Sequence, residues 1–176
     1  RVFSMERAGE NFLLPQAGLT LSGRTARTML SDCDQAALLC CTLGVKFTAL
    51  LQARQARDMA QAVILDACGS ALVEAGCDAA QAELAERLPG RCLTDRFSPG
   101  YGDLPLALQP TLCAALDAPR RVGVHVTGQY LLDPDKSVTA IIGLSDRPQA
   151  ARVRGCAFCA LRERCTLRKG GTTCVI

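Results

Sequence analysis

The chain has 176 residues, of which 49% are hydrophobic and 21% are charged, and its formal net charge is +3. This length and composition are typical of one globular domain with a real hydrophobic core. The small net charge does not favour nucleic-acid binding, and residues 1–10 lack the apolar stretch of a secretion signal. Because no apolar run of about eighteen residues is evident, we expect a soluble, cytoplasmic protein without a membrane span.

The first predicted helix covers residues 36–51, an apolar run that follows a candidate N-cap at Ser31 or Asp32. The preceding residues 11–23 mix Asn, Pro, Gly and Ser with Leu, so we expect a loop or a short extended segment there. Gly44 interrupts the apolar run, and a glycine in a helix interior costs about 1 kcal/mol relative to alanine. It therefore either permits close packing or separates two helices.

Two more helices are predicted before the middle of the chain. One covers residues 56–74 and ends at Gly76, and a more polar one covers residues 78–87 with Asp78 as its N-cap. The first of these helices carries an apolar stripe at helical spacing. Its members are Met59, Ala60, Val63, Ile64, Ala67, Ala71 and Leu72.

The second half of the chain is expected to hold the sheet. A helix is predicted over residues 106–116, which the stretch 117–119 stops. Residues 121–131 alternate valines with small or polar residues and indicate a strand, and residues 138–144 read as the returning strand after a turn at 133–135. Helices that precede a small, mainly antiparallel sheet predict an α+β fold in which the N-terminal helices pack on that sheet.

The run RFSPGYGDLP, residues 96–105, predicts a ligand-binding loop. Its prolines remove amide donors and its glycines permit unusual backbone angles, which excludes a helix interior. Such a loop exposes backbone groups beside one cation, and Arg96 can form a forked pair with a carboxylate. This combination suits a small zwitterionic or anionic ligand, and a plain turn without a ligand is the alternative.

Four of the eleven cysteines form a C-x2-C-x5-C-x8-C cluster near the C-terminus, at Cys156, Cys159, Cys165 and Cys174. Without a secretion signal, so dense a set of thiols indicates a metal rather than disulfides. An iron-sulfur cluster or a structural zinc ion accepts four thiolates, and a tail without metal or with disulfides stays open. The other seven cysteines are interpreted as small buried hydrophobes. We therefore divide the chain into a domain of residues 1–148 and a Cys-rich metal-binding tail of residues 149–176.

Several runs together resemble a known family. They are RFSPGY at residues 96–101, P-x-K-S-V-T-A-I-I-G at 134–143, T-L-G at 42–44, and L-D-A-C-G-S at 65–70 with Glu74. In this order they resemble the activation domain of cobalamin-dependent methionine synthase, and most closely its shorter, separately encoded members. The resemblance extends from about Leu14 to about Leu144.

The resemblance implies a protein that binds S-adenosylmethionine and acts on the corrinoid module of a cobalamin-dependent methionine synthase. There an electron donor reduces an oxidised cobalt, and the bound sulfonium methylates it, so that positioning does most of the catalysis. By the same resemblance, Arg96 holds the methionine carboxylate. The other implied site residues are Pro99, Gly100 and Tyr101, which shape the loop, and Asp66 and Glu74, either of which meets the amino group or the ribose.

Beyond Leu144 the chain departs from the longer family members, because Ser-Asp-Arg-Pro and the cysteine cluster replace the sheet and helix that help to cover the cofactor. One hypothesis is that an iron-sulfur centre in the tail supplies the electron that a flavoprotein would otherwise donate. A non-catalytic binding or electron-transfer module for a corrinoid protein is the alternative function. A nucleic-acid binder that uses the basic tail is the third candidate.

Overall fold

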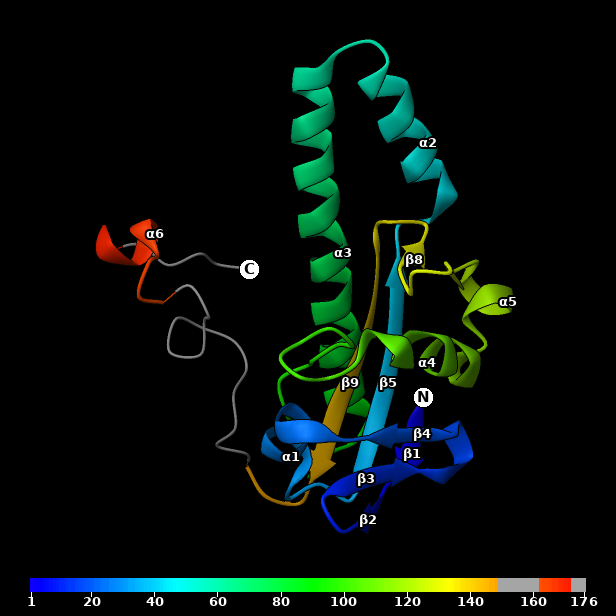
Figure 1. Ribbon diagram of the computed structural model, residues 1–176, viewed down its shortest axis with the longest axis vertical. Helices are drawn as coiled ribbons and strands as arrows, with labels where there is room; N and C mark the ends of the chain where they lie inside the picture. The colour runs from blue at the N-terminus through cyan, green and yellow to red at the C-terminus, as the bar shows by residue number, and fades with distance from the viewer. Residues whose placement is uncertain (149–161, 172–176) are drawn as a thin grey trace.

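The computed structural model describes residues 1–148 and 162–171 and has an α+β fold with antiparallel sheets, as predicted (Figure 1). Its main sheet has four strands in the order β1-β5-β9-β6. The two central strands pair antiparallel over their whole length, from Gln35 opposite Leu144 to Thr42 opposite Ser137. The four strands are β1 (Val2–Ser4), β5 (Gln35–Thr42), β9 (Ser137–Ser145) and β6 (Cys92–Leu93).

The rest of the described secondary structure consists of two smaller sheets and a set of helices. The small sheets are β2 (Glu6–Ala8), β3 (Asn11–Leu14) and β4 (Leu19–Leu21), and the pair β7 (His125–Val126) and β8 (Leu132–Asp133). The helices are α1 (Gly23–Leu30), α2 (Gly44–Gln55), α3 (Met59–Arg87), α4 (Gln109–Leu116), α5 (Ala118–Val122) and α6 (Thr166–Lys169), with short 3-10 turns η1 (Pro15–Ala17) and η2 (Leu106–Leu108).

The helix predicted over residues 36–51 is wrong in its first half, which is the central strand β5. Ala, Leu and Cys carry no strong strand preference, but β1 and β9 pair with β5 on both sides, and such pairing overrides local propensity. Because both faces of β5 are covered, its sequence lacks the alternation of a half-buried strand. Gly44 marks the change from strand to helix, with a φ of +74° that favours glycine.

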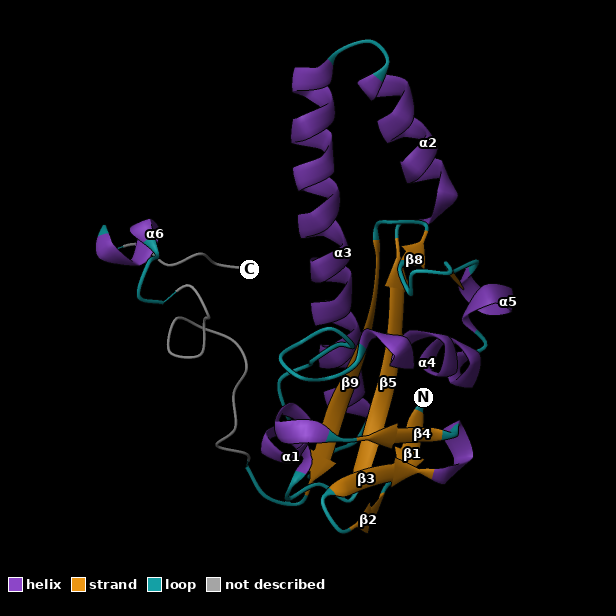
Figure 2. Ribbon diagram, in the orientation of Figure 1, coloured by secondary structure: helices purple, strands orange, loops and turns teal. Residues whose placement is uncertain are grey.

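The two helices predicted around Gly76 are one continuous helix, α3, so the predicted break there is wrong. Gly76 lies inside the helix beside the Cys41 thiol, where an added Cβ would come within 2.9 Å of the sulfur. Asp58 begins α3, because its side chain accepts a hydrogen bond of 3.0 Å from the Gln61 amide. Figure 2 shows that α2 and the first half of α3 form a helical hairpin that extends beyond the strands.

The second half of the chain follows the predictions more closely. The helix over 106–116 is confirmed as η2 followed by α4, and the returning strand over 138–144 is confirmed as β9. The strand predicted over 121–131 is largely wrong, because the range begins in α5, contains a turn and is a strand only at β7.

The main sheet separates two groups of buried side chains. Ala36, Leu38 and Ile141 join the larger core, which includes Phe12, Phe97 and Leu112. Ala37, Ile142 and Leu144 face the other side, where Leu84 of α3 packs against them. Successive residues of a strand point to opposite faces, so α3 covers one face of the sheet, and α4 with the small sheet β2-β3-β4 covers the other.

The apolar stripe predicted on α3 is largely exposed. Met59, Val63, Ile64 and Leu72 are 58–64% exposed, whereas the buried residues of the helix are Ala62, Gly69, Val73 and Cys77. Within the described residues, α3 is the one helix long and apolar enough to cross a membrane, although core helices of globular proteins also meet that criterion. The expectation that no run of this length and hydropathy occurs is therefore corrected.

Candidate functional site

Arg96 reaches α3 because its segment runs beside β9 in extended form. The Phe97 amide donates to the Ile141 carbonyl at 3.0 Å, and the Ile141 amide donates back to the Phe97 carbonyl at 2.8 Å. Since neighbouring residues of an extended segment point to opposite sides, Phe97 enters the core while Arg96 points toward α3. The Arg96 side chain is 4% exposed.

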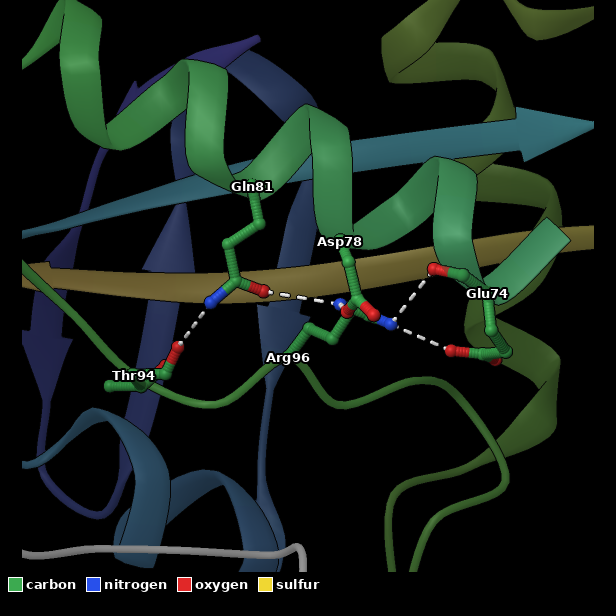
Figure 3. A network of polar contacts seen from close by, with 5 residues as sticks. All are labelled: Glu74, Asp78, Gln81, Thr94 and Arg96. Atoms are coloured by element: carbon green, nitrogen blue, oxygen red, sulfur yellow. Dashed lines mark hydrogen bonds and ion pairs between the residues drawn. The ribbon is translucent and has the colours of Figure 1, made fainter. Parts of the chain in front are cut away.

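Three side chains of α3 hold the Arg96 guanidinium (Figure 3). Arg96 Nη2 lies 2.7 Å from Glu74 Oε2 and donates to the Glu74 carbonyl at 3.3 Å. Arg96 Nη1 lies 2.5 Å from Asp78 Oδ1 and 3.4 Å from Gln81 Oε1. Gln81 in turn donates from Nε2 to the Thr94 carbonyl at 3.4 Å, which ties the network back to the strand segment.

The two carboxylates keep Arg96 charged. Burial alone would lower the pKa of the guanidinium, but the hydrogen bonds and charges of Glu74 and Asp78 outweigh it and raise that pKa above its ordinary value. The two acids differ in exposure: the Glu74 side chain is 28% exposed and the Asp78 side chain 62%. Asp78 is therefore the more solvent-accessible of the two partners.

A polar hollow of about 350 Å³ opens beside this network, between the second half of α3 and the segment around β6. Its wall carries two carboxylates, Asp78 and Asp95, and one guanidinium, that of Arg96. The remaining lining residues are Gln81, Ala82, Ala85 and Leu93.

The loop after Arg96 makes a tight turn of its own. The Gly100 amide donates to the Leu104 carbonyl at 2.9 Å and the Tyr101 amide to the Ser98 carbonyl at 3.0 Å. A φ of +93° at Gly100 is a conformation that other residues rarely adopt. Pro99 is buried and Tyr101 is 49% exposed, and neither they nor Gly100 line the hollow.

Asp103 ties this loop to α1. Its carboxylate accepts hydrogen bonds from the amides of Thr25, at 2.8 Å, and Arg24, at 2.6 Å, and so caps the helix from a distant part of the chain. The hydrogen bonds from Thr25 and then Arg24 hold the pKa of Asp103 well below its ordinary value. An added Cβ at Gly23 would lie 2.8 Å from the carboxylate, so this approach needs glycine.

Asp66 lies away from the hollow and is paired with Lys136. The Lys136 ammonium is 2.8 Å from Asp66 Oδ1 and donates to Ser70 Oγ at 3.0 Å. Two of the sequence runs therefore meet here, since Lys136 belongs to 134–143 and both Asp66 and Ser70 belong to 65–70. Of the six predicted ligand-site residues, the structure joins Arg96 with Glu74 and places the other four elsewhere.

Sequence reasoning missed Asp78, Gln81 and Asp95. Glu74, Asp78 and Gln81 have the i, i+4, i+7 spacing of one helical face, but the predicted stop at Gly76 divided them between two helices. If α3 had been predicted as one continuous helix, the sequence alone would have placed these three side chains on one face.

The proposed metal ligands lie mostly outside the described residues, which exclude Cys156, Cys159 and Cys174. Cys165 is described, and its sulfur accepts a hydrogen bond of 3.5 Å from the Arg168 amide at the start of α6. In residues 1–148 and 162–171, no group of three or more His, Cys, Asp or Glu side chains is arranged to hold a metal ion.

The interpretation of the other seven cysteines as buried hydrophobes holds in part. Cys77 and Cys113 are buried, Cys33, Cys40, Cys41 and Cys92 are half-buried, and Cys68 is exposed on α3. Burial raises the pKa of the Cys40 and Cys77 thiols to about 12, so neither is a ready nucleophile.

No protein-family model matches the sequence, and no curated protein matches it.

Proposed function

We propose that this protein is a cytoplasmic accessory factor for the reductive reactivation of a cobalamin-dependent methionine synthase, and that it binds S-adenosylmethionine in the hollow beside Arg96. The supporting observation is that sequence runs far apart in the chain meet on α3. Arg96 of the RFSPGY run pairs with Glu74 at 2.7 Å, and Lys136 pairs with Asp66 at 2.8 Å. These are the same runs that resemble the activation domain.

The hollow suits the charges of the proposed ligand. S-adenosylmethionine carries two positive groups, the sulfonium and the amino group, and one carboxylate. The carboxylates of Asp78 and Asp95 on the wall match the positive groups by charge. The ligand carboxylate reaches Arg96 by replacing Asp78, whose exposed side chain then turns toward a positive group of the ligand.

The chain's own residues then bind and orient the ligand. Arg96 is held in place by Glu74 and by the Glu74 carbonyl even when Asp78 leaves, so the guanidinium is preset for a second carboxylate. When bound, S-adenosylmethionine would supply a methyl group to the reduced cobalt, with S-adenosylhomocysteine as the product. The proposal assigns no general base or nucleophile to this chain.

The binding step is tested by isothermal titration with S-adenosylmethionine and with its decarboxylated analogue. We expect the decarboxylated form to bind at least about tenfold more weakly, which corresponds to about 1.4 kcal/mol, because it lacks the group that pairs with Arg96. In Arg96→Lys this preference should shrink, since lysine cannot form the forked pair.

Asp95→Asn should weaken binding of both ligands, and Asp32→Asn, at an exposed site away from the hollow, is the matched control. Equal affinity for the two ligands would show that Arg96 does not bind the ligand carboxylate. Absence of binding at millimolar ligand would instead favour the alternative, a non-catalytic binding or electron-transfer module for a corrinoid protein.

The metal proposal concerns the tail and is tested separately. Anaerobic purification followed by analysis of iron, sulfide and zinc is expected to give stoichiometric iron and sulfide in the full chain, with Cys156, Cys159, Cys165 and Cys174 as ligands. Zinc alone would indicate a structural role for the tail and would contradict its role as electron donor.

A further inference from the structure

Two thiols lie against each other where α3 packs on the central strand. Cys41 belongs to β5 and Cys77 to α3, and both are free thiols in the structure. The Cys41 side chain is the hydrogen-bonding neighbour of the Cys77 thiol. An added Cβ at Gly76 would lie 2.9 Å from Cys41 Sγ, so this sulfur reaches the α3 backbone at the residue before Cys77. The two thiols are therefore placed for a bond that needs little movement of either element.

The alternation of side chains along β5 explains why Cys41, and not its neighbour Cys40, meets α3. Successive residues of a strand point to opposite faces, and Ala37, four residues before Cys41, faces the side that α3 covers. Cys40 points to the other side, where Cys113 of α4 acts on its thiol through charge. The strand thus offers two candidate pairs of thiols, and the pair in hydrogen-bonding contact is Cys41 with Cys77.

The two thiols differ in their access to solvent. Cys41 is half-buried near the end of β5, whereas the Cys77 side chain is fully buried. Burial and the neighbouring Cys41 raise the pKa of the Cys77 thiol to about 12, and the positive charge of Arg96 opposes them. A reagent from solution therefore meets Cys41 first, and Cys77 reacts only from inside the protein.

We propose that Cys41 and Cys77 form a reversible disulfide by exchange with a small-molecule disulfide of the glutathione class. In the first step the Cys41 thiolate attacks one sulfur of the reagent, and a mixed disulfide forms as the first thiol leaves. In the second step the deprotonated Cys77 sulfur attacks the Cys41 sulfur, and the second thiol leaves. The two cysteines lose two electrons and two protons, and the reagent is reduced to two thiols. An excess of thiol reverses both steps.

Proximity makes the second step feasible although the pKa of Cys77 is high. A group held against its target reacts at an effective concentration far above that of a thiol in solution. The mixed disulfide also removes the Cys41 thiol that helps to raise the pKa of Cys77. In a reducing compartment the bond forms only when the pool of small disulfides rises, so we expect a transient modification rather than a bond of the resting fold.

The bond would act on the turn of α3 that holds Arg96. Cys77 lies between Glu74 and Asp78 in the sequence, and both of these carboxylates pair with Arg96 (Figure 3). A covalent link from Cys77 to β5 would fix this turn against the sheet. The disulfide does not depend on what binds in the hollow, so its tests need no ligand and are separate from those of the proposed function.

The first test is a peptide map of the full-length protein after exchange with glutathione disulfide and alkylation of the remaining thiols. A Cys68→Ser background is used, because Cys77 is then the one thiol of the tryptic peptide 58–87. We expect this peptide to be linked to peptide 28–46, which contains Cys41, and dithiothreitol should separate them. If Cys77 stays reduced, or is linked to a peptide of the C-terminal tail, the proposal is overturned.

Single variants identify the partner, because peptide 28–46 also contains Cys33 and Cys40. Cys41→Ala should lower the yield of linked peptide by at least about tenfold, since no thiol then lies against Cys77. Cys40→Ala is the matched control on the next residue of the same strand, and it should keep the link. If Cys41→Ala does not fold, Cys41→Ser makes the same test with a side chain of similar size. A link that survives the loss of Cys41 would refute the pairing.

The order of the two steps is tested with Cys77→Ala in the same background. The exchange should stop at the mixed disulfide, so that peptide 28–46 carries glutathione at Cys41. In Cys41→Ala, by contrast, Cys77 should remain a free thiol, because it is buried. Glutathione bound to Cys77 in Cys41→Ala, or none bound to Cys41 in Cys77→Ala, would contradict the proposed exchange.

Thermal denaturation gives a readout that does not depend on the peptide map. The oxidised protein should unfold at a higher temperature than the reduced protein, because a link between distant residues restricts the unfolded chain. This difference should vanish in Cys41→Ala and persist in Cys40→Ala. An oxidised protein that unfolds at a lower temperature would show that Cys41 and Cys77 are not placed for the bond, and the proposal would be refuted.

Discussion

The sheet core and the α2–α3 hairpin have similar apolar content but opposite exposure. Ile141 of β9 is fully buried between β5 and its neighbours, whereas Ile64 of α3 is 64% exposed. The same type of side chain is therefore part of the hydrophobic core in one region and part of the exposed surface in the other. The difference teaches that apolar composition measures how much surface must be covered, while topology decides whether the chain covers it itself.

The largest expected effect separates these two isoleucines directly. Ile141→Ala should lower the free energy of unfolding by about 3 kcal/mol, because it leaves a cavity in the core. Ile64→Ala should change it by less than about 0.5 kcal/mol, because the Ile64 side chain is largely exposed. Urea denaturation of both variants gives the comparison, and similar losses at the two sites would show that the hairpin face is buried in the monomer.

A second comparison sets the buried Arg96 against an exposed arginine. Arg96→Ala should lower the free energy of unfolding by about 3 kcal/mol, because Glu74 loses its partner in a largely buried site. Arg27→Ala removes an ion pair with Glu10 in which the two side chains are 41% and 80% exposed, and it should cost less than about 1 kcal/mol. Urea denaturation of the two variants should preserve this order. A reversed order would contradict the description of Arg96 as a buried side chain that links α3 to the segment beside β9.

Gly69 tests how the hairpin is held together on its inner side. An added Cβ would lie 2.4 Å from the Phe47 ring, so Gly69→Ala forces the ring to move. Alanine gains about 1 kcal/mol of helix propensity, but overpacking costs about 1–3 kcal/mol, so we expect a net loss of about 1 kcal/mol. Thermal denaturation measures it, with Gly128→Ala as a control at a glycine that has open space around it. A stabilised Gly69→Ala variant would mean that α2 is free to shift.

The smallest change at neutral pH is expected for Asp103→Asn, since asparagine also caps helices well. The pKa of Asp103 is lowered in the folded protein, so its stabilisation is complete above the unfolded value of about 3.9 and is lost as the pH falls through the folded value. Wild type should therefore lose more stability than the variant on acidification below about pH 4. If urea titrations at a series of pH values show that both proteins lose the same stability on acidification, this assignment is contradicted.

The parts of the fold that the sequence predicts best are those with a single local signal. Residues 138–144 are rich in β-branched residues after a turn and form β9, and residues 106–116 form a helix that ends at Asp117. The central strand β5 could not be predicted in this way, because its Ala, Leu and Cys residues suit a buried helix as well as a buried strand. Only pairing with β1 and β9, which is not local information, decides between them.

The candidate site shows the same limit. Arg96 is the feature that the sequence indicates most clearly, and the structure places it at the wall of the hollow. Its partners depend on whether α3 continues through Gly76, and a glycine signal alone favours a stop. The packing of Gly76 beside Cys41 explains why glycine is present without ending the helix.

The attachment of Asp103 to α1 has a consequence for how the loop after Arg96 behaves. Any outward movement of residues 98–104 would withdraw the carboxylate from the amides of Arg24 and Thr25 and leave the first turn of α1 uncapped. The loop is thus preorganised: its conformational entropy is already lost before a ligand arrives. The segment that follows Arg96 is therefore fixed outside the hollow, and the adjustable element beside Arg96 would be the exposed Asp78 side chain rather than this backbone.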